Sequence, residues 1–249
     1  MNATHGTHAA HHGTATPGGL LITEDGYTLA PEARVLRPGP VDFRFRILGP
    51  DGEPVREYAT IHDRELHLIV ARRDLTAFWH VHPVEDGGVW TVRLDLPEAG
   101  AYRVFTDVAP AALGRTLTLG ADVEIAGPYD PRPVPAPGRT WTDGAYEIVL
   151  AGEPAAGEGR AITFTVREDG RPVGDLEPYL AAYGHLVVLR AGDLAYVHVH
   201  PDGEPGDGRT EPGPEIGFHV GLPGPGTYRL FLDFKHGGAV RTADFTVTA

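Results

Sequence analysis

The sequence contains no cysteine, and its single methionine is Met1. The absence of thiols excludes disulfides, thiolate metal sites, cysteine nucleophiles and blue-copper centres. The lack of internal methionine excludes a methionine-rich copper(I) site. Any metal bound by this chain must therefore be held by histidine nitrogens and by carboxylate or backbone oxygens.

Long apolar segments and a basic balance are also missing. No apolar run approaches the ~18 residues that a membrane span requires, and no basic segment followed by an apolar core marks a signal peptide. Lys+Arg number 21 against 34 for Asp+Glu, which gives a formal charge of −13. An acidic chain is a poor partner for nucleic acid and anionic membranes, so neither is expected. The acidity suits solubility and is also compatible with attracting cations.

Helical periodicity is scarce, whereas strand signals are frequent. The 33 glycines and 23 prolines accompany a near-normal apolar content of 41%, a combination typical of short strands joined by tight turns. Apolar alternation and β-branched or aromatic residues predict strands over 41–48, 67–71, 76–82, 89–94, 100–107, 117–119 and 122–125. This density of short strands predicts a β-sandwich.

The second half of the chain repeats the first. Asp51–Val55 recurs as Asp169–Val173, and Leu96–Asp107 recurs as Leu222–Asp233. The offset between copies rises from 118 to 126 residues, which places the extra residues of the second copy in 201–214. An internal duplication of this length predicts two copies of one fold.

A Pro-x-x-Gly-x-Tyr element occurs in both copies, at Tyr102 and Tyr228. It matches the tyrosine corner of immunoglobulin-like sandwiches, although an ordinary strand tyrosine is the alternative. The predicted fold class is all-β, with two tandem immunoglobulin-like β-sandwich domains. The expected organisation is a disordered His-rich tail over 1–19, domain 1 over 20–127, a Pro-rich linker over 128–139 and domain 2 over 140–249.

The tail carries four histidines among small and polar residues. They are His5, His8, His11 and His12. Such a cluster would bind Cu(II), Ni(II) or Zn(II) weakly and without geometric selectivity. The segment is interpreted either as a loose metal-gathering tail or as a low-complexity leader.

Histidines recur at one spacing in both copies. A His-x-His-Pro motif occupies 80–83 and 198–201, and in each copy 12 residues separate its first histidine from a histidine upstream. The two trios are His67, His80 and His82, and His185, His198 and His200. Strand residues two apart share a face, so the motif histidines project together. A hairpin loop of two or four residues centred on Arg73-Asp74 would set His67 opposite His80, and the same count about Ala191-Gly192 would set His185 opposite His198.

Three converging neutral imidazoles suit Zn(II) or Cu(II) and leave a fourth coordination position open. The candidates for that position are Asp107 and Asp233, which recur at the end of the tyrosine-corner strand. Each could be a ligand, an acceptor for an imidazole N–H, or a turn residue. The histidines without a counterpart in the other copy are His62, His219 and His236, interpreted as surface or half-buried side chains.

The stretches 62–83 and 182–201 also carry a resemblance. The chain resembles an uncharacterised family of secreted or membrane-anchored proteins of high-GC Gram-positive bacteria, with tandem immunoglobulin-like domains and repeated His-x-His-Pro motifs. The likeness covers about residues 18–247. Members are described as heavy-metal-binding proteins, and the resemblance implies an extracytoplasmic, secreted or cell-surface location.

Three functions are compatible with these patterns. The favoured one is a non-enzymatic protein that sequesters or delivers Cu(II) or Zn(II), with one His trio in each domain. The second is a structural or interaction protein whose histidines are packing residues. The third is a zinc-dependent hydrolytic enzyme that uses the open coordination position. The sequence shows no nucleophile elbow, P-loop or His-Glu-x-x-His motif, and predicts no catalytic or organic-cofactor-binding residue.

Overall fold

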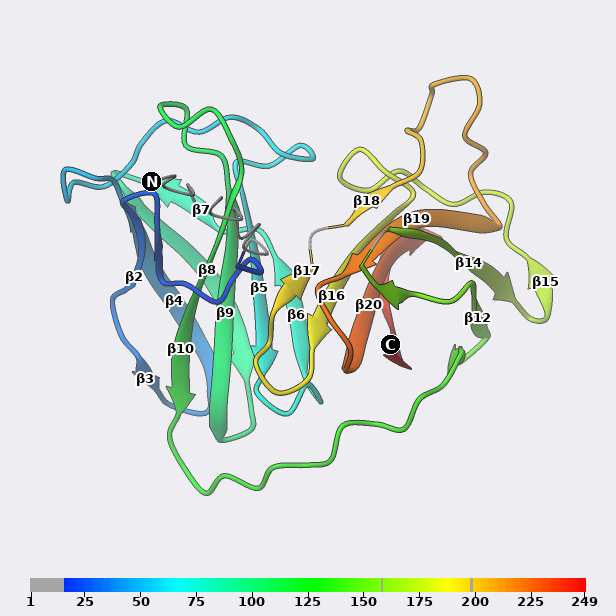
Figure 1. The fold of residues 1–249 in the computed structure, drawn as a ribbon, viewed down its shortest axis with the longest axis horizontal. Helices are drawn as coiled ribbons and strands as arrows, with labels where there is room; N and C mark the ends of the chain where they lie inside the picture. Colours follow the sequence, from blue (N-terminus) through cyan, green and yellow to red (C-terminus); the bar gives the residue numbers. More distant parts are fainter. Residues whose placement is uncertain (1–15, 158, 198) are drawn as a thin grey trace, which may run out of the picture.

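The computed structural model describes residues 16–157, 159–197 and 199–249, and for His200 only the backbone. These residues form two β-sandwiches that lie side by side (Figure 1). The prediction of an all-β fold with two tandem immunoglobulin-like sandwiches is confirmed. No helix among the described residues is long and apolar enough to cross a membrane. Most of the predicted tail, residues 1–15, lies outside the described residues.

The first half contains two five-stranded sheets. One sheet has the order β1 (Thr23–Glu24), β2 (Tyr27–Pro31), β4 (Gly39–Leu48), β8 (Val89–Leu96) and β7 (Val84–Asp86). The facing sheet has the order β3 (Val35–Leu36), β10 (Leu117–Ile125), β9 (Gly100–Val108), β5 (Leu66–Arg72) and β6 (Phe78–Val81). The two segments predicted within 117–125 form one strand, and the short strands β1, β2, β3 and β7 were not predicted.

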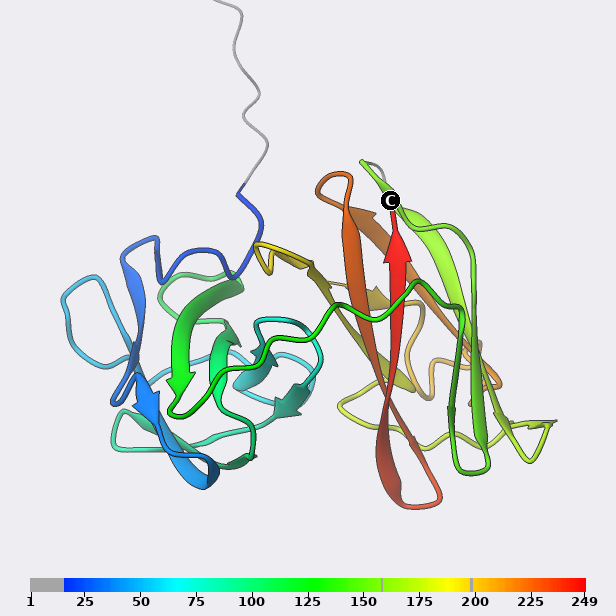
Figure 2. The same cartoon turned by 90° about the horizontal axis from the view of Figure 1, so that it is seen from below.

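The second half repeats this plan with small differences. One sheet has the order β11 (Thr140–Asp143), β12 (Tyr146–Ala151), β14 (Arg160–Glu168), β19 (Glu215–Leu222) and β13 (Ala155–Ala156), with β15 (Arg171–Pro172) on β14 and β18 (His200–Pro201) on β19. The other sheet has the order β17 (Tyr196–Val197), β16 (Gly184–Arg190), β20 (Thr227–His236) and β21 (Ala239–Thr248). Residues 126–139 connect the halves without a strand and run along one side of both (Figure 2).

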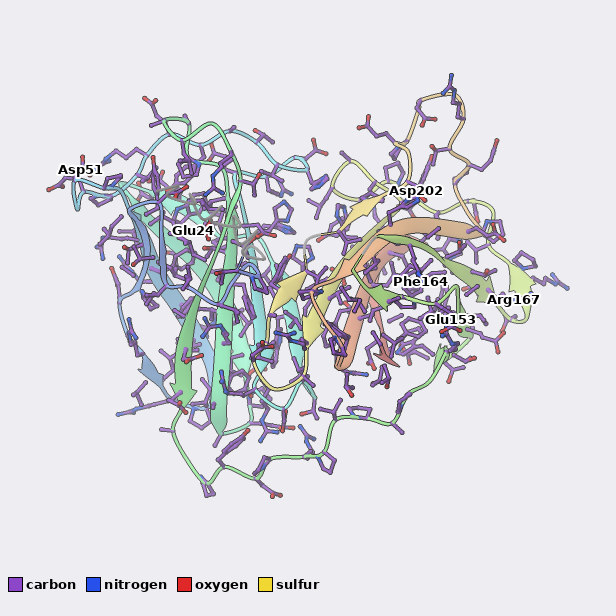
Figure 3. The ribbon with its side chains drawn as sticks, in the orientation of Figure 1. Glu24, Asp51, Glu153, Phe164, Arg167 and Asp202 are labelled. Carbon is purple, nitrogen blue, oxygen red and sulfur yellow. The ribbon has the colours of Figure 1, made fainter. Side chains whose placement is uncertain are left out.

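Each half encloses its own apolar core. In β4, buried Phe43, Phe45 and Ile47 alternate with more exposed residues, as expected for a strand with one face inward. In β14 the side chain of Phe164 lies inside the second sandwich, whereas Arg167 lies at its outer edge (Figure 3). Separate clusters of buried residues in the two halves show that each sandwich packs around a core of its own.

The tyrosine corner is present in both halves. The hydroxyl of Tyr102 donates to the carbonyl of Glu98 at 2.9 Å, and that of Tyr228 donates to the carbonyl of Gly224 at 2.7 Å. Both tyrosines are fully buried. The prediction made from the repeated Pro-x-x-Gly-x-Tyr element is therefore confirmed.

Removing one of these hydroxyls should destabilise the fold modestly. Tyr102→Phe or Tyr228→Phe deletes one hydrogen bond and leaves a carbonyl without its tyrosine donor, at a cost of about 1–2 kcal/mol. Urea unfolding of each variant measures this loss, with Tyr129→Phe as the matched control because Tyr129 is exposed. Midpoints equal to that of the control would show that the corner adds nothing to stability.

A third apolar cluster lies between the halves, where β5, β6 and β9 face β16, β17 and β20 (Figure 1). Most of its members come in duplicated pairs: Ile69 with Val187, Ala71 with Leu189, Phe105 with Phe231, and Phe78 with Tyr196. Leu75 and Leu194, which lie one position apart in the two hairpin loops, also belong to it. The rings of Phe78 and Phe231 stack with centroids 4.1 Å apart. This packing fixes the two sandwiches against each other through apolar burial.

The first described residues lie at the edge of this interface. The backbone N–H of Tyr196 donates to the carbonyl of Gly18 at 3.0 Å, and the Arg103 guanidinium donates to the carbonyl of Gly19 at 2.7 Å. A side chain at Gly120 would collide with that same carbonyl, because a Cβ there would lie 2.0 Å from it. Residues 18 and 19, assigned to the tail from sequence, are thus held in place between the halves.

Candidate metal centre

The hairpin of β5 and β6 carries the first trio in a register different from the predicted one. Ile69 pairs with His80, and Leu68 pairs with Val81. The predicted pairing of His67 with His80 is wrong by two residues, and His67 instead lies diagonal to His80. Because the shift is an even number, every side chain keeps its face, and the histidines still project together.

The geometry of the loop explains the shift. The backbone N–H of Arg72 donates to the carbonyl of Ala77 at 3.0 Å, so the loop is centred one residue later than predicted. Leu75 adopts a left-handed conformation with φ of 59° and is fully buried between the halves. A leucine rarely occupies this conformation, and sequence patterns alone do not mark it.

The second copy repeats the shift. Leu189 pairs with Tyr196, and Leu194 has a φ of 60°. The predicted facing of His185 and His198 therefore does not match this register, and His198 itself lies outside the described residues. The backbone at His200 pairs with His219 on the opposite sheet. In this copy the end of the His-x-His-Pro motif therefore belongs to a different sheet from the hairpin strands β16 and β17.

The first trio converges as predicted. Nδ1 of His67 lies 3.1 Å from Nε2 of His80 and 3.1 Å from Nε2 of His82. One ligand atom from each histidine lies within 4.8 Å of the other two. The three imidazoles thus present nitrogens to one small volume, which is the arrangement that a metal ion requires.

A tight turn fixes the orientation of His67. Ile61 and Arg64 exchange backbone hydrogen bonds around His62 and Asp63, whose φ values of 46° and 60° give the turn its left-handed central residues. The carbonyl of Ile61 accepts from Nε2 of His67 at 2.8 Å. Since a carbonyl only accepts, Nε2 carries the proton and Nδ1 of the neutral ring presents its lone pair.

The same device recurs at His185. Its Nε2 donates to the carbonyl of Tyr179 at 2.8 Å, in a turn where Leu180 and Ala181 have φ values of 53° and 60°. The repeated contact shows that the duplication retains the orientation of this imidazole along with the strand that carries it.

His80 is oriented from the other half of the molecule. Its Nδ1 lies 2.7 Å from Oδ2 of Asp233, and both side chains are 5% exposed. An ionised carboxylate only accepts, so Nδ1 donates and Nε2 presents its lone pair toward His67. A carboxylate behind an imidazole in this way is characteristic of metal-binding histidines.

These two orientations leave two acceptors facing each other. When each ring carries its one proton on the nitrogen that faces the outer acceptor, the inner nitrogens of His67 and His80 direct lone pairs toward each other across 3.1 Å. In the metal-free protein, Nε2–H of His82 can donate to Nδ1 of His67. A cation that accepts both lone pairs would relieve this arrangement.

Burial lowers the pKa of three histidines of this region. It lowers the pKa of His67 to about 4 and that of His82 to about 3, and the neighbouring imidazoles reinforce both shifts. The pKa of His185 is lowered to about 4, again mainly by burial. Neutral rings are the form that binds a metal ion, so these low pKa values favour binding at neutral pH.

A small cavity of about 30 Å³ lies beside the trio, between the two halves. His67, His80, His185 and Asp107 are among the residues that line it. A space of this size accommodates about one water molecule. His62 also lines it, with its ring centroid 5.3 Å from that of His185 and 6.2 Å from that of His67.

Sequence reasoning did not predict a role for His62, because the second copy has Leu180 at the corresponding position. The other unmatched histidines lie elsewhere. His219 is exposed and contacts Asp202 at 2.8 Å, and His236 contacts the Tyr146 hydroxyl at 2.7 Å.

The two aspartates proposed for the fourth position have different surroundings. Asp233 contacts His80, and its other oxygen accepts from Thr242 at 2.5 Å. Asp107 accepts from the hydroxyls of Thr118 at 2.5 Å and Tyr196 at 2.8 Å, so it too is contacted from the opposite half. Among the described residues, neither aspartate joins the group of three whose ligand atoms converge.

The fold and this cluster define a class: a tandem β-sandwich protein with a buried histidine group next to the interface between its halves. The chain belongs to the family described as a domain of unknown function, DUF8832, whose model matches residues 22–125 and 140–249. The two matched segments correspond to the two sandwiches. A comparison with curated proteins gives no significant match.

The chain is also similar, at low sequence identity, to several solved structures. Escherichia coli alpha-2-macroglobulin activated by porcine elastase is 13% identical over 89% of this chain and 20% of its own, with a TM-score of 0.28. The D0-D1 domain of Intimin is 10% identical over 89% of this chain and 97% of its own, with a TM-score of 0.25. Domains 4–9 of the surface layer protein SbsC are 13% identical over 88% of this chain and 31% of their own length, with a TM-score of 0.24.

Proposed function

We propose that this protein binds a Zn(II) or Cu(II) ion through Nδ1 of His67, Nε2 of His80 and Nε2 of His82, and sequesters or delivers that ion. The observation that carries the proposal is the approach of Nδ1 of His67 to Nε2 of His80 and to Nε2 of His82, at 3.1 Å in each case. With metal–nitrogen bonds of about 2.0 Å, tetrahedral ligands lie about 3.3 Å from one another. The two observed 3.1 Å separations therefore need little adjustment to hold an ion.

A purely structural role for the histidines accounts less well for this geometry. Packed histidines normally satisfy each ring nitrogen with a donor or acceptor of the opposite kind. Here the backbone carbonyl and the carboxylate impose protonation on the outer nitrogens and turn the inner ones toward each other. Hydrogen bonds to the outer nitrogens thus orient the inner nitrogens, as is usual for histidines that bind a metal ion.

The second trio belongs to the same proposal. His185, His198 and His200 are candidate ligands by the duplication, and the orientation of His185 by Tyr179 supports its inclusion. An extracytoplasmic location, suggested by the resemblance of the His-x-His-Pro stretches, would suit capture of metal from outside the cell. Three protein ligands and an open fourth position are also compatible with transfer of the ion to a partner.

Metal uptake by the full chain tests the proposal. The tail histidines His5, His8, His11 and His12 should first be replaced by Gln, so that weak binding there does not contribute. The protein, purified without a metal-affinity step, should retain at least one Zn(II) or Cu(II) ion per chain after dialysis against metal-free buffer. Uptake below about a third of an ion per chain, with no heat on titration, would contradict the proposal.

A further inference from the structure

We infer that Asp233, which belongs to the second half, is a positioning residue for the metal site of the first half. It fixes the tautomer of His80, so the trio is ready for a metal ion only when the two halves are docked. This inference rests on the proposed function, and it adds that the binding unit is the pair of sandwiches and not one sandwich alone.

The hydrogen bond between His80 and Asp233 is short and buried, and a neighbouring side chain holds the carboxylate. Nδ1 of His80 and Oδ2 of Asp233 are 2.7 Å apart, and both side chains are buried. The other carboxylate oxygen accepts from Thr242, which lies directly across from Asp233 in the ladder of β20 and β21. A side chain of the same sheet therefore holds the Asp233 carboxylate independently of its contact with His80.

The interface determines where this carboxylate lies. Phe78 is two residues before His80 on β6, and Phe231 is two residues before Asp233 on β20. Residues two apart on a strand share a face, so the Phe78–Phe231 stack and the His80–Asp233 hydrogen bond are adjacent contacts between the same two strands. Movement of one half against the other would break both together.

The first half has an equivalent aspartate but does not use it for His80. Asp107 occupies the position that corresponds to Asp233, and its oxygens accept from Thr118 and from Tyr196 of the second half. The carboxylates of the duplicated strands thus face side chains of the opposite half. His80 takes its carboxylate from the second sandwich, which packs on the face of the hairpin that carries Phe78 and His80.

Replacing the carboxylate by an amide should reverse the tautomer. In Asp233→Asn, the Thr242 hydroxyl can still donate to the amide oxygen, which turns the amide NH2 toward Nδ1 of His80. Nδ1 then has to accept, and the ring proton moves to Nε2, the atom that should bind the metal. In a buried Asp–His pair, this exchange preserves the geometry and selects the wrong tautomer.

The test combines two measurements on the full chain with the four tail histidines replaced. Long-range proton–nitrogen NMR on the metal-free protein reports the tautomer, with His80 assigned by its loss in His80→Asn. We expect Nδ1–H in the parent and Nε2–H in Asp233→Asn. Titration with Zn(II) should show an affinity about 10–100-fold weaker in Asp233→Asn.

Asp244→Asn is the matched control. Asp244 is also on the second half and pairs with Arg229, but it does not contact His80. This control should keep both the Nδ1–H tautomer and the parental affinity. If Asp233→Asn does not fold, Thr242→Val removes the support of the carboxylate instead, and a several-fold loss of Zn(II) affinity is expected.

The outcomes separate this inference from the proposed function. An Nε2–H tautomer of His80 in the parent, or parental affinity in Asp233→Asn, overturns the inference while metal binding stands. If the parent takes up neither Zn(II) nor Cu(II), the proposed function fails, and with it the role of Asp233 at a metal site, whatever the tautomer of His80.

Discussion

His67→Gln should weaken Zn(II) or Cu(II) binding by at least about 100-fold without unfolding the protein. The glutamine amide NH2 can replace Nε2–H of His67 as the donor to the carbonyl of Ile61. It offers no atom at the position of Nδ1, which is 3.1 Å from both other ligand nitrogens. Loss of a direct ligand should exceed the 10–100-fold effect of losing an outer hydrogen-bond partner. Isothermal titration with each metal measures the change.

His80→Asn provides the complementary variant. The asparagine amide can donate to Asp233 as Nδ1–H does, but it does not reach the position of Nε2. It should lose binding to the same extent as His67→Gln. His219→Gln is the control, since His219 is exposed, pairs with Asp202 and is not one of the three converging histidines. Tight binding that survives both ligand substitutions would mean that the metal site lies elsewhere.

Acidification should destabilise the metal-free protein well before the carboxylates titrate. The pKa values of His67 and His185 are lowered to about 4 and that of His82 to about 3, so each is neutral in the folded state at a pH where the unfolded chain binds a proton. Their contribution to stability is complete above the unfolded pKa of about 6.5 and is lost as pH falls toward about 4. The total effect should be on the order of a few kcal/mol.

Urea unfolding at pH 7 and pH 5 measures this loss. The urea midpoint should be lower at pH 5 than at pH 7. The decrease should be smaller in His82→Gln, which has one titrating group fewer. Added Zn(II) should raise the midpoint at pH 7, because an ion that binds only the folded state stabilises it. A midpoint that is constant from pH 7 to pH 5 would show that these rings are not buried in neutral form.

The sequence predicted the elements of the fold because their signals are local. Alternation in 41–48, the tyrosine element at Tyr102 and Tyr228, and the duplication each depend on a few neighbouring residues. The convergence of His67 with His80 and His82 was predicted for the same reason. It needed only the two-residue period of a strand, which survived the error in register.

The error in register had a physical source outside those local rules. A hairpin loop is usually located by glycine or asparagine in the left-handed conformation. Here the residue with positive φ is Leu75, buried at the interface between the halves. Tertiary packing stabilises a conformation that leucine would otherwise avoid, so the loop centre could not be located from the local sequence.

The sequence marked Asp233 as a possible acceptor for an imidazole N–H. It did not indicate an acceptor for a histidine of the other half, because a duplication suggests two self-contained halves. One signal was nevertheless present. The run His67-Leu-Ile-Val-Ala71 does not alternate, and every residue of β5 is buried. A continuous apolar strand is typical of a sheet covered on both faces, which here means the core on one side and the other sandwich on the opposite side.

The contacts between the sandwiches are reciprocal. Phe78 stacks on Phe231, and their duplicated counterparts Tyr196 and Phe105 have ring centroids 5.6 Å apart. Reciprocity of this kind is the property of a two-fold symmetric dimer, in which the same patch of each subunit meets itself. Residues 126–139 tether the two patches within one chain. Because the two patches belong to one chain, each has a high effective concentration near the other, and no encounter between separate molecules is needed. A site that depends on both patches would therefore stay assembled however dilute the protein becomes.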